Sequence, residues 1–144
     1  MQIVKISLII FFLTTTSVFS DDRSSLKYFR ASIDEIQTLF TYAENVTKTQ
    51  GSSGTITNTQ VQKIINHAKK SFEFSKLVKN DDLDWLDPSL LIKSLSKNYE
   101  NLFRKGLIIY IEAWENGDPA KGVEANKLLN KWGKYYKKIR KKII

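Results

Sequence analysis

Apolar side chains recur every three or four residues through most of this chain, which is the spacing of one face of an α-helix. The first stretch predicts a helix over about 24–46, with an apolar stripe made of Leu26, Phe29, Ile33, Ile36, Phe40, Ala43 and Val46. Polar residues and two glycines then interrupt the pattern over 47–60 and predict a loop. A second apolar stripe predicts a helix over about 58–79, and Thr57 with Gln60 three residues later resembles a capping box at its start.

The dipeptide Asp-Pro occurs twice, at 87–88 and at 118–119, and predicts the starts of two more helices. In each pair a side chain that can cap a helix directly precedes a proline. Proline has a fixed φ and no N–H, both of which suit the first position of a helix. We therefore expect helices over about 88–116 and 119–143, with Gly117 ending the first of them.

These elements predict an all-α domain, because strictly alternating apolar and polar residues, the mark of β-strands, are almost absent. The four expected helices have similar lengths and are joined by short or medium connections. Such helices favour antiparallel packing, so we expect an up-down four-helix bundle. The third helix is expected to bury a stripe made of Leu91, Leu95, Tyr99, Leu102, Ile109 and Ala113.

The first twenty residues have a different pattern, typical of a secretory signal peptide. Lys5 precedes an apolar run from Ile6 to Leu13, and Val18 and Ser20 are small enough for the −3 and −1 positions of a cleavage site. We therefore expect cleavage between Ser20 and Asp21. An uncleaved membrane anchor is the alternative, but the run is shorter than the roughly 20 residues that span a bilayer. The predicted organisation is a signal peptide over 1–20 and one helical domain over 21–144.

The chain contains no cysteine, so the exported domain must be stable without disulfides. A domain of this size can bury enough apolar surface to be so. A chain without cysteine fits a periplasm better than a harsher extracellular setting. The expected location is therefore exported, either periplasmic or secreted.

The composition argues against catalysis. Without cysteine and with His67 as the one histidine, the chain has no thiol nucleophile and no cluster of histidines for a metal. Glu112 and Glu115 lie three residues apart, a spacing common on solvated helix faces. The acidic segment 81–87 lacks the glycine and the distant glutamate of an EF-hand loop. We expect no enzymatic activity, no metal site and no cofactor.

Charge is concentrated at the C-terminus. Residues 121–144 contain nine Lys or Arg and one acid, Glu124, so this segment carries +8, which is the net charge of the whole chain. Five of the lysines follow a 4, 3, 4, 3 spacing and predict one basic helix face: Lys127, Lys131, Lys134, Lys138 and Lys141. A solvated face without a partner usually mixes both signs. The stripe therefore favours an anionic partner, which could also be the acidic segment 81–87 of the same chain.

Two kinds of binding function follow from these features. The first is binding to another envelope or secreted protein, as an adaptor, inhibitor or immunity-type factor, through an exposed aromatic patch at Trp85 or Trp114. The alternative is peripheral binding to an anionic membrane surface or anionic glycan through the basic stripe of the last helix. Export argues against nucleic acid as the partner. We expect no transmembrane segment after signal cleavage.

Overall fold

The structure is a computed structural model that describes residues 25–50 and 54–143, and the predicted signal peptide lies outside this range. Within these residues every regular element is helical, which confirms the all-α prediction. No helix in this part of the chain is long and apolar enough to cross a membrane. The described residues form five helices where four were predicted: α1 (Leu26–Gln50), α2 (Asn58–Lys76), α3 (Asn80–Ser89), a continuous helix made of α4 (Leu95–Asn98), the π-helical segment η2 (Tyr99–Arg104) and α5 (Lys105–Asn116), and α6 (Pro119–Ile143).

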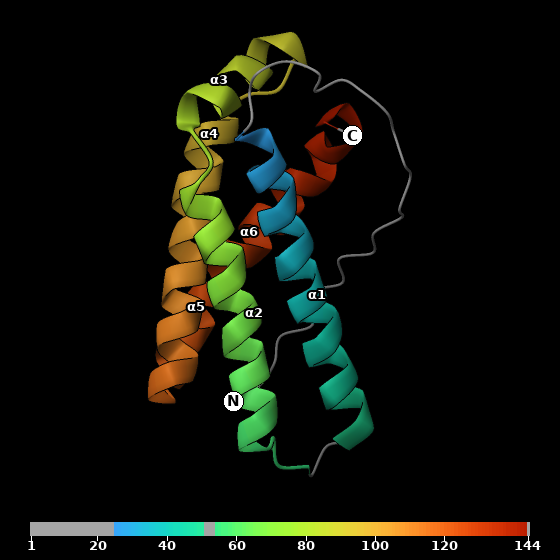
Figure 1. Cartoon of the computed structure of the whole chain (residues 1–144), viewed down its shortest axis with the longest axis vertical. Helices are drawn as coiled ribbons and strands as arrows, with labels where there is room; N and C mark the ends of the chain where they lie inside the picture. The colour runs from blue at the N-terminus through green and yellow to red at the C-terminus, as the bar shows by residue number, and fades with distance from the viewer. Residues whose placement is uncertain (1–24, 51–53, 144) are drawn as a thin grey trace.

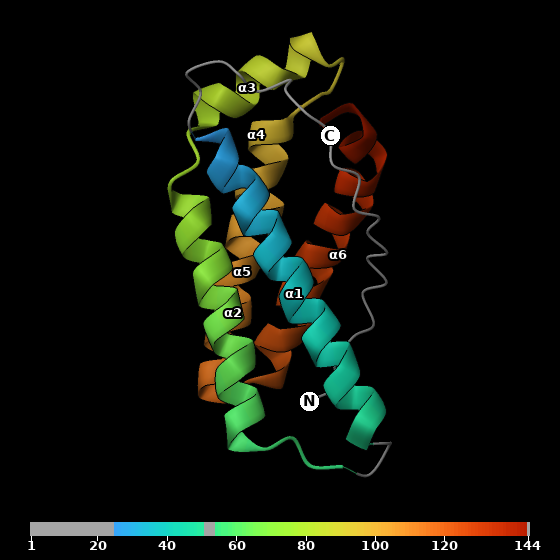
Figure 2. The same cartoon turned by 45° about the vertical axis from the view of Figure 1, so that its right-hand side comes forward.

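The long helices alternate in direction, and α3 lies across one end of them (Figure 1). From that end α1 runs to the opposite end and α2 returns beside it. The continuous helix α4–η2–α5 then runs away again, and α6 crosses back obliquely toward α3 (Figure 2). The C-terminal part of α6 therefore lies close to the connection between α3 and α4.

Two of the predicted helix starts and one predicted stop are present. At the start of α2, the Thr57 side chain accepts a hydrogen bond from the Gln60 N–H, and the Gln60 side chain accepts one from the Thr57 N–H. Asp118 accepts hydrogen bonds from two N–H groups in the first turn of α6, at 3.0 and 3.1 Å, and Pro119 is the first helical residue. Gly117 ends α5 with φ +61°, a conformation that glycine adopts without strain.

The third helix does not begin where the sequence predicted. The acidic segment 81–87, expected to be a loop, belongs to α3, and Pro88 lies inside that helix instead of opening the next one. Burial explains the difference, because Leu83 and Leu86 are three residues apart and are 0% and 1% exposed on the same helical face. The acids in its first turn also interact favourably with the helix dipole.

Asp87 caps a helix, although not the adjacent one. Its carboxylate accepts hydrogen bonds from the N–H of Leu95, at 3.1 and 3.3 Å, and so it caps α4 from eight residues away. The intervening turn contains two non-glycine residues with positive φ, Leu91 at 52° and Ser94 at 62°. Leu91 had been predicted in the buried stripe of the third helix, but it is 82% exposed.

The π-helical segment explains which side chains of the continuous helix are buried. Leu95, Tyr99, Phe103 and Leu107 are all 0% exposed, and they are spaced by four residues each time. In an α-helix, with about 3.6 residues per turn, each step of four turns the buried face by about 40°. The wider π-helical turn, with its i→i+5 hydrogen bonds, compensates for this drift. Leu102, predicted to be in the stripe, is therefore only partly buried.

An aromatic cluster anchors α6 to the other helices. The Trp132 ring lies 6.4 Å from that of Phe29, 5.6 Å from Tyr99 and 5.4 Å from Phe103, measured between centroids. Tyr99 and Ser32 share a hydrogen bond of 2.7 Å inside the cluster, and burial raises the pKa of Tyr99 above its ordinary value. These contacts set the rotation of α6 about its axis and hence the direction in which its lysines point.

Candidate functional site

Five lysines of α6 form one exposed surface, called the basic face below: Lys127, Lys131, Lys134, Lys138 and Lys141. At about 100° per residue they fall within about 80° of the helix circumference. Gly122, Ala125, Leu129 and Trp132 occupy the buried side of the same helix. The sequence spacing thus corresponds to a continuous strip of positive charge along α6.

In the part of the chain that the structure describes, neighbouring acids leave the basic face unpaired. None of its lysines has an ion pair within the residues that the structure describes. Exposed lysines on α1 and α2 behave differently, because Lys48, Lys69 and Lys76 form ion pairs of 2.6–2.8 Å with Glu44, Glu115 and Glu73. The five lysines of the basic face thus differ from these paired lysines in having no ion pair within the described residues.

The acids of α3 do not compensate the basic face either. Asp82 accepts a hydrogen bond from the Ser25 hydroxyl, and Asp87 caps α4. Asp81 and Asp84 are exposed. In the described part of the chain no ion pair joins any of these four acids to the basic face, so the acidic segment of the chain is not its anionic partner there.

The C-terminal turns of α6 hold the connection between α3 and α4. The Tyr135 hydroxyl donates a hydrogen bond of 2.8 Å to the carbonyl of Lys93, and the Lys142 ammonium donates one of 2.9 Å to the carbonyl of Leu91. The exposed side chain of Leu91 is thereby placed beside the lysine-rich end of α6. Sequence reasoning missed this surface, because it placed Leu91 in a helix.

Of the two tryptophans expected in an exposed aromatic patch, only one is exposed. Trp85, on α3, is 37% exposed, whereas Trp114, on α5, is 9% exposed and lies against Tyr110 with 6.1 Å between ring centroids. The prediction for Trp114 is wrong because the face of α5 that carries it packs inward. Leu77 is also exposed, at 52%, at the C-terminal end of α2.

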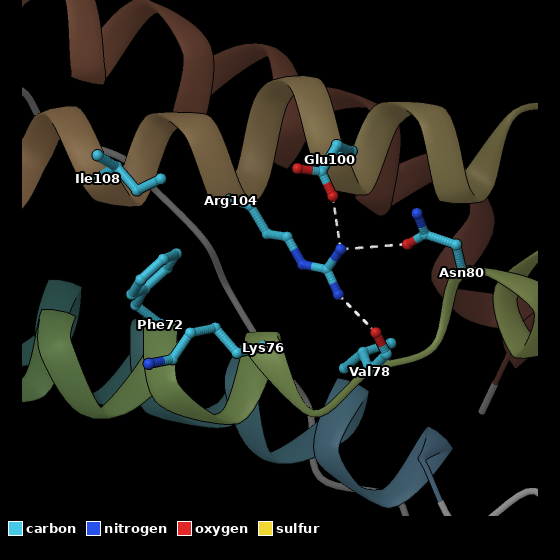
Figure 3. A pocket seen from close by; sticks show the side chains of 7 residues that line it. All are labelled: Phe72, Lys76, Val78, Asn80, Glu100, Arg104 and Ile108. Atoms are coloured by element: carbon cyan, nitrogen blue, oxygen red, sulfur yellow. Dashed lines mark hydrogen bonds and ion pairs between the residues drawn. The ribbon is translucent and has the colours of Figure 1, made fainter.

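A pocket of about 390 Å³ lies between the end of α2 and the continuous helix (Figure 3). It is lined by Phe72, Lys76, Val78, Asn80, Glu100, Arg104 and Ile108. A guanidinium in a pocket is a common site for a carboxylate or phosphate ligand. The availability of the Arg104 N–H groups therefore decides whether this pocket can hold an anion.

Arg104 has no N–H group left for a ligand. Its Nε and Nη2 donate to the carbonyl of Ser75 at 3.1 and 2.6 Å, and Nη2 also donates to the carbonyl of Val78 at 2.6 Å. Its Nη1 donates to Asn80 at 3.1 Å and to Glu100 at 2.5 Å (Figure 3). All five donors of a guanidinium are thus used. Arg104 holds the C-terminal end of α2, and the pocket is not an anion site.

His67 also has a structural partner. Its Nδ1 lies 2.5 Å from a carboxylate oxygen of Glu35 on α1, and the other oxygen of Glu35 lies 3.0 Å from the Lys70 ammonium. Burial alone would raise the pKa of Glu35, but the hydrogen bonds and charges of His67 and Lys70 outweigh it and lower the pKa below its ordinary value. This cluster connects α1 to α2.

Glu112 and Glu115, the acids considered for catalysis in the sequence, lie on α5. Glu112 and Glu115 do not share a proton or a ligand, since each pairs with a lysine, Lys121 at 2.7 Å and Lys69 at 2.6 Å. The described part of the chain contains no group of three or more His, Cys, Asp or Glu side chains that could hold a metal ion.

No protein-family model, no curated protein and no solved structure matches this chain. Three features of the structure bear on its function. These are the basic face of α6, the exposed side chains at the α3 end, and the pocket beside Arg104. In the pocket beside Arg104, the guanidinium donors are already used by the protein itself. The two exposed surfaces therefore remain as candidate binding sites.

Proposed function

We propose that this protein is an exported, non-enzymatic helical protein, periplasmic or secreted, that binds anionic surfaces through the basic face of α6. The main support is that the five lysines are exposed on one strip and have no ion pair within the described residues. A face of one sign adds self-repulsion to a folded domain, so folding alone does not favour it. The ligand chemistry is a dense array of negative charge, as on anionic lipid headgroups or an anionic glycan.

The proposed scaffold is an antiparallel up-down bundle of the four long helices. In this arrangement α6 contributes one side to the aromatic cluster around Trp132 and the other side to the ligand. The lysines are then held on a rigid helix, and their relative positions need not be ordered when the ligand binds. A preorganised array loses less conformational entropy on binding than a flexible basic tail.

The expected strength follows from the charge count. Each basic residue near an anionic membrane surface contributes about 1 kcal/mol. Five lysines therefore contribute about 5 kcal/mol, or roughly a 10³- to 10⁴-fold preference for the anionic surface over a neutral one. Because the lysines are exposed, salt screens this attraction over about 8 Å at physiological ionic strength. Binding should consequently weaken steeply as salt is added.

The test is sedimentation of residues 21–144 with anionic and neutral lipid vesicles across a salt series, and a parallel assay on an immobilised sulfated polysaccharide. This segment contains every helix and the whole core of the described structure. We expect binding to the anionic vesicles or to the polysaccharide at low salt and loss of that binding at high salt. Absence of binding to both anionic supports at low salt would overturn the proposal.

A matched pair of variants separates the basic face from general positive charge. The first changes the five lysines of the basic face to Gln. The second changes the same number of exposed lysines on α1, α2 and α5 to Gln: Lys48, Lys63, Lys69, Lys76 and Lys105. Both variants have the same net charge, so a difference in binding reports the position of the lysines. We expect only the first variant to lose binding, because only it lacks the basic face. Equal loss in both would show that net charge, and not the basic face, drives the association.

Binding to another envelope or secreted protein is a second candidate, supported by the exposure of Trp85. This side chain is 37% exposed on α3 and directly follows the exposed acid Asp84. An aromatic side chain within a polar rim is the usual centre of a protein interface. A partner bound there should lose affinity when Trp85 is changed to Ala, and the basic-face variant should leave that affinity unchanged.

A further inference from the structure

Leu91 has two properties that are unusual for a leucine. Its φ of 52° is a conformation that glycine and asparagine adopt at lower cost than a branched residue. Its side chain is 82% exposed, the highest exposure among the large apolar residues of the described chain. A single exposed leucine is common on protein surfaces. An exposed leucine at a position whose backbone also disfavours it is better explained by a contact outside the domain.

The turn around Leu91 is closed by a backbone hydrogen bond and directs this side chain outward. The N–H of Ile92 donates to the carbonyl of Asp87 at 2.8 Å, which closes the turn after α3. Ile92 is 5% exposed, and Leu90, on the other side, is partly buried against the core. Because both neighbours point inward, the side chain between them is held away from the protein.

Two lysines lie near the backbone of Leu91. Lys142 Nζ lies 2.9 Å from the carbonyl oxygen of Leu91 itself, and Lys93 is exposed two residues along the chain. Tyr135 fixes the Lys93 carbonyl against α6. The exposed Lys138 and Lys141 of the basic face lie on the same C-terminal turns of α6 as these two anchoring residues.

We propose that the anionic surface is a lipid bilayer, and that Leu91 enters its interfacial region while the lysines at the end of α6 bind the headgroups. This inference rests on the proposed function and adds the identity of the surface and the orientation of the protein on it. An apolar side chain flanked by lysines matches a bilayer, where acyl chains lie directly beneath anionic headgroups. A soluble anionic polymer has charge without an apolar layer and leaves Leu91 without a role.

The first test compares Leu91→Asn with Leu77→Asn on residues 21–144. Asparagine tolerates positive φ, so the Leu91→Asn protein should fold at least as well as the wild type. We expect partitioning onto anionic vesicles to fall about fivefold to tenfold for Leu91→Asn, because a partly buried leucine no longer contributes. Leu77 is exposed on the end of α2, and its change should leave partitioning within about twofold.

The second test detects the environment of the side chain directly and does not depend on a change in affinity for the vesicles. The natural chain contains no cysteine, so Leu91→Cys and Leu77→Cys each provide a single attachment point for an environment-sensitive fluorophore. With anionic vesicles we expect a blue shift from the label at 91 and none from the label at 77. With the sulfated polysaccharide we expect no shift from either label.

The outcomes distinguish this inference from the proposed function. Salt-dependent binding to vesicles, loss of affinity in Leu91→Asn and a blue shift at 91 together support both. Salt-dependent binding with full affinity in Leu91→Asn and an unshifted label overturns the bilayer insertion and leaves the anionic site in place. Binding to the polysaccharide without binding to vesicles has the same meaning. Absence of binding to any anionic support overturns the proposed function itself.

Discussion

Replacing Arg104 with methionine tests whether the hydrogen bonds of its guanidinium hold the C-terminal end of α2. Methionine keeps the apolar stem, and the substitution removes three hydrogen bonds from the guanidinium to the carbonyls of Ser75 and Val78. The arginine side chain is only 13% exposed, so water replaces these bonds poorly. We expect Arg104→Met to destabilise the domain.

The magnitude follows from the partners that remain. The Ser75 carbonyl still accepts a hydrogen bond of 3.2 Å from the N–H of Val78, so its loss is partial. The Val78 carbonyl loses a charged donor at 2.6 Å. A hydrogen bond from a charged group contributes about 1.5–3 kcal/mol, and an unpaired buried acceptor costs about 1–3 kcal/mol. We expect the free energy of unfolding to fall by about 2–4 kcal/mol.

Urea unfolding followed by circular dichroism measures this change, and two further variants identify its cause. Lys105→Met changes the same charge on an exposed neighbour and should stay within about 0.5 kcal/mol of the wild type. Arg104→Lys keeps the charge without the planar fork and should recover less than half of the loss. If the free energy of unfolding of Arg104→Met is within about 0.5 kcal/mol of the wild-type value, Arg104 does not hold the end of α2. The pocket beside Arg104 then again becomes a candidate site.

Three further predictions concern the helix contacts. Because the folded pKa of Glu35 is lowered, this group stabilises the protein above its ordinary pKa of 4.5 and the effect disappears as the pH falls through the folded pKa. The difference in melting temperature between the wild type and Glu35→Gln should therefore shrink from pH 6 toward pH 3 (approximate limits from the ordinary carboxyl range), and a constant difference would contradict the role of the His67 pair. Gly106→Ala should lower the free energy of unfolding by about 1 kcal/mol in urea titrations. A Cβ at this position lies 2.9 Å from the buried side chain of Leu129, and the resulting strain exceeds the gain in helix propensity. A more stable variant would show that Leu129 moves freely. Asp87→Ala removes the cap of α4 and should cost about 1 kcal/mol, measured in the same way, whereas an unchanged protein would mean that the cap is redundant.

The sequence by itself determined those features that depend on neighbouring residues. The capping box at Thr57 and the stop and start at Gly117 and Asp118 follow from backbone groups within a few positions of each other. The 3–4 periodicity is also local, since it specifies an apolar side and a polar side for any helix that forms. For the same reason the spacing of the lysines, without knowledge of the fold, predicted their alignment along one face of α6.

Only the tertiary structure decided the features that depend on distant segments. The burial of Leu83 and Leu86 against the ends of other helices turned an acidic segment into α3 and carried Pro88 into its interior. The placement of Arg104 beside the last carbonyls of α2 requires two helices to meet, and no spacing in the chain encodes it.

The contact between Lys142 and the Leu91 carbonyl joins residues 51 positions apart. The position of Leu91 beside the end of α6 could therefore not be predicted from the sequence either. Local hydrogen bonding and periodicity act over a few residues and can be read along the chain. Burial is decided by whichever surface arrives from elsewhere, and it therefore appears only when the helices are packed together.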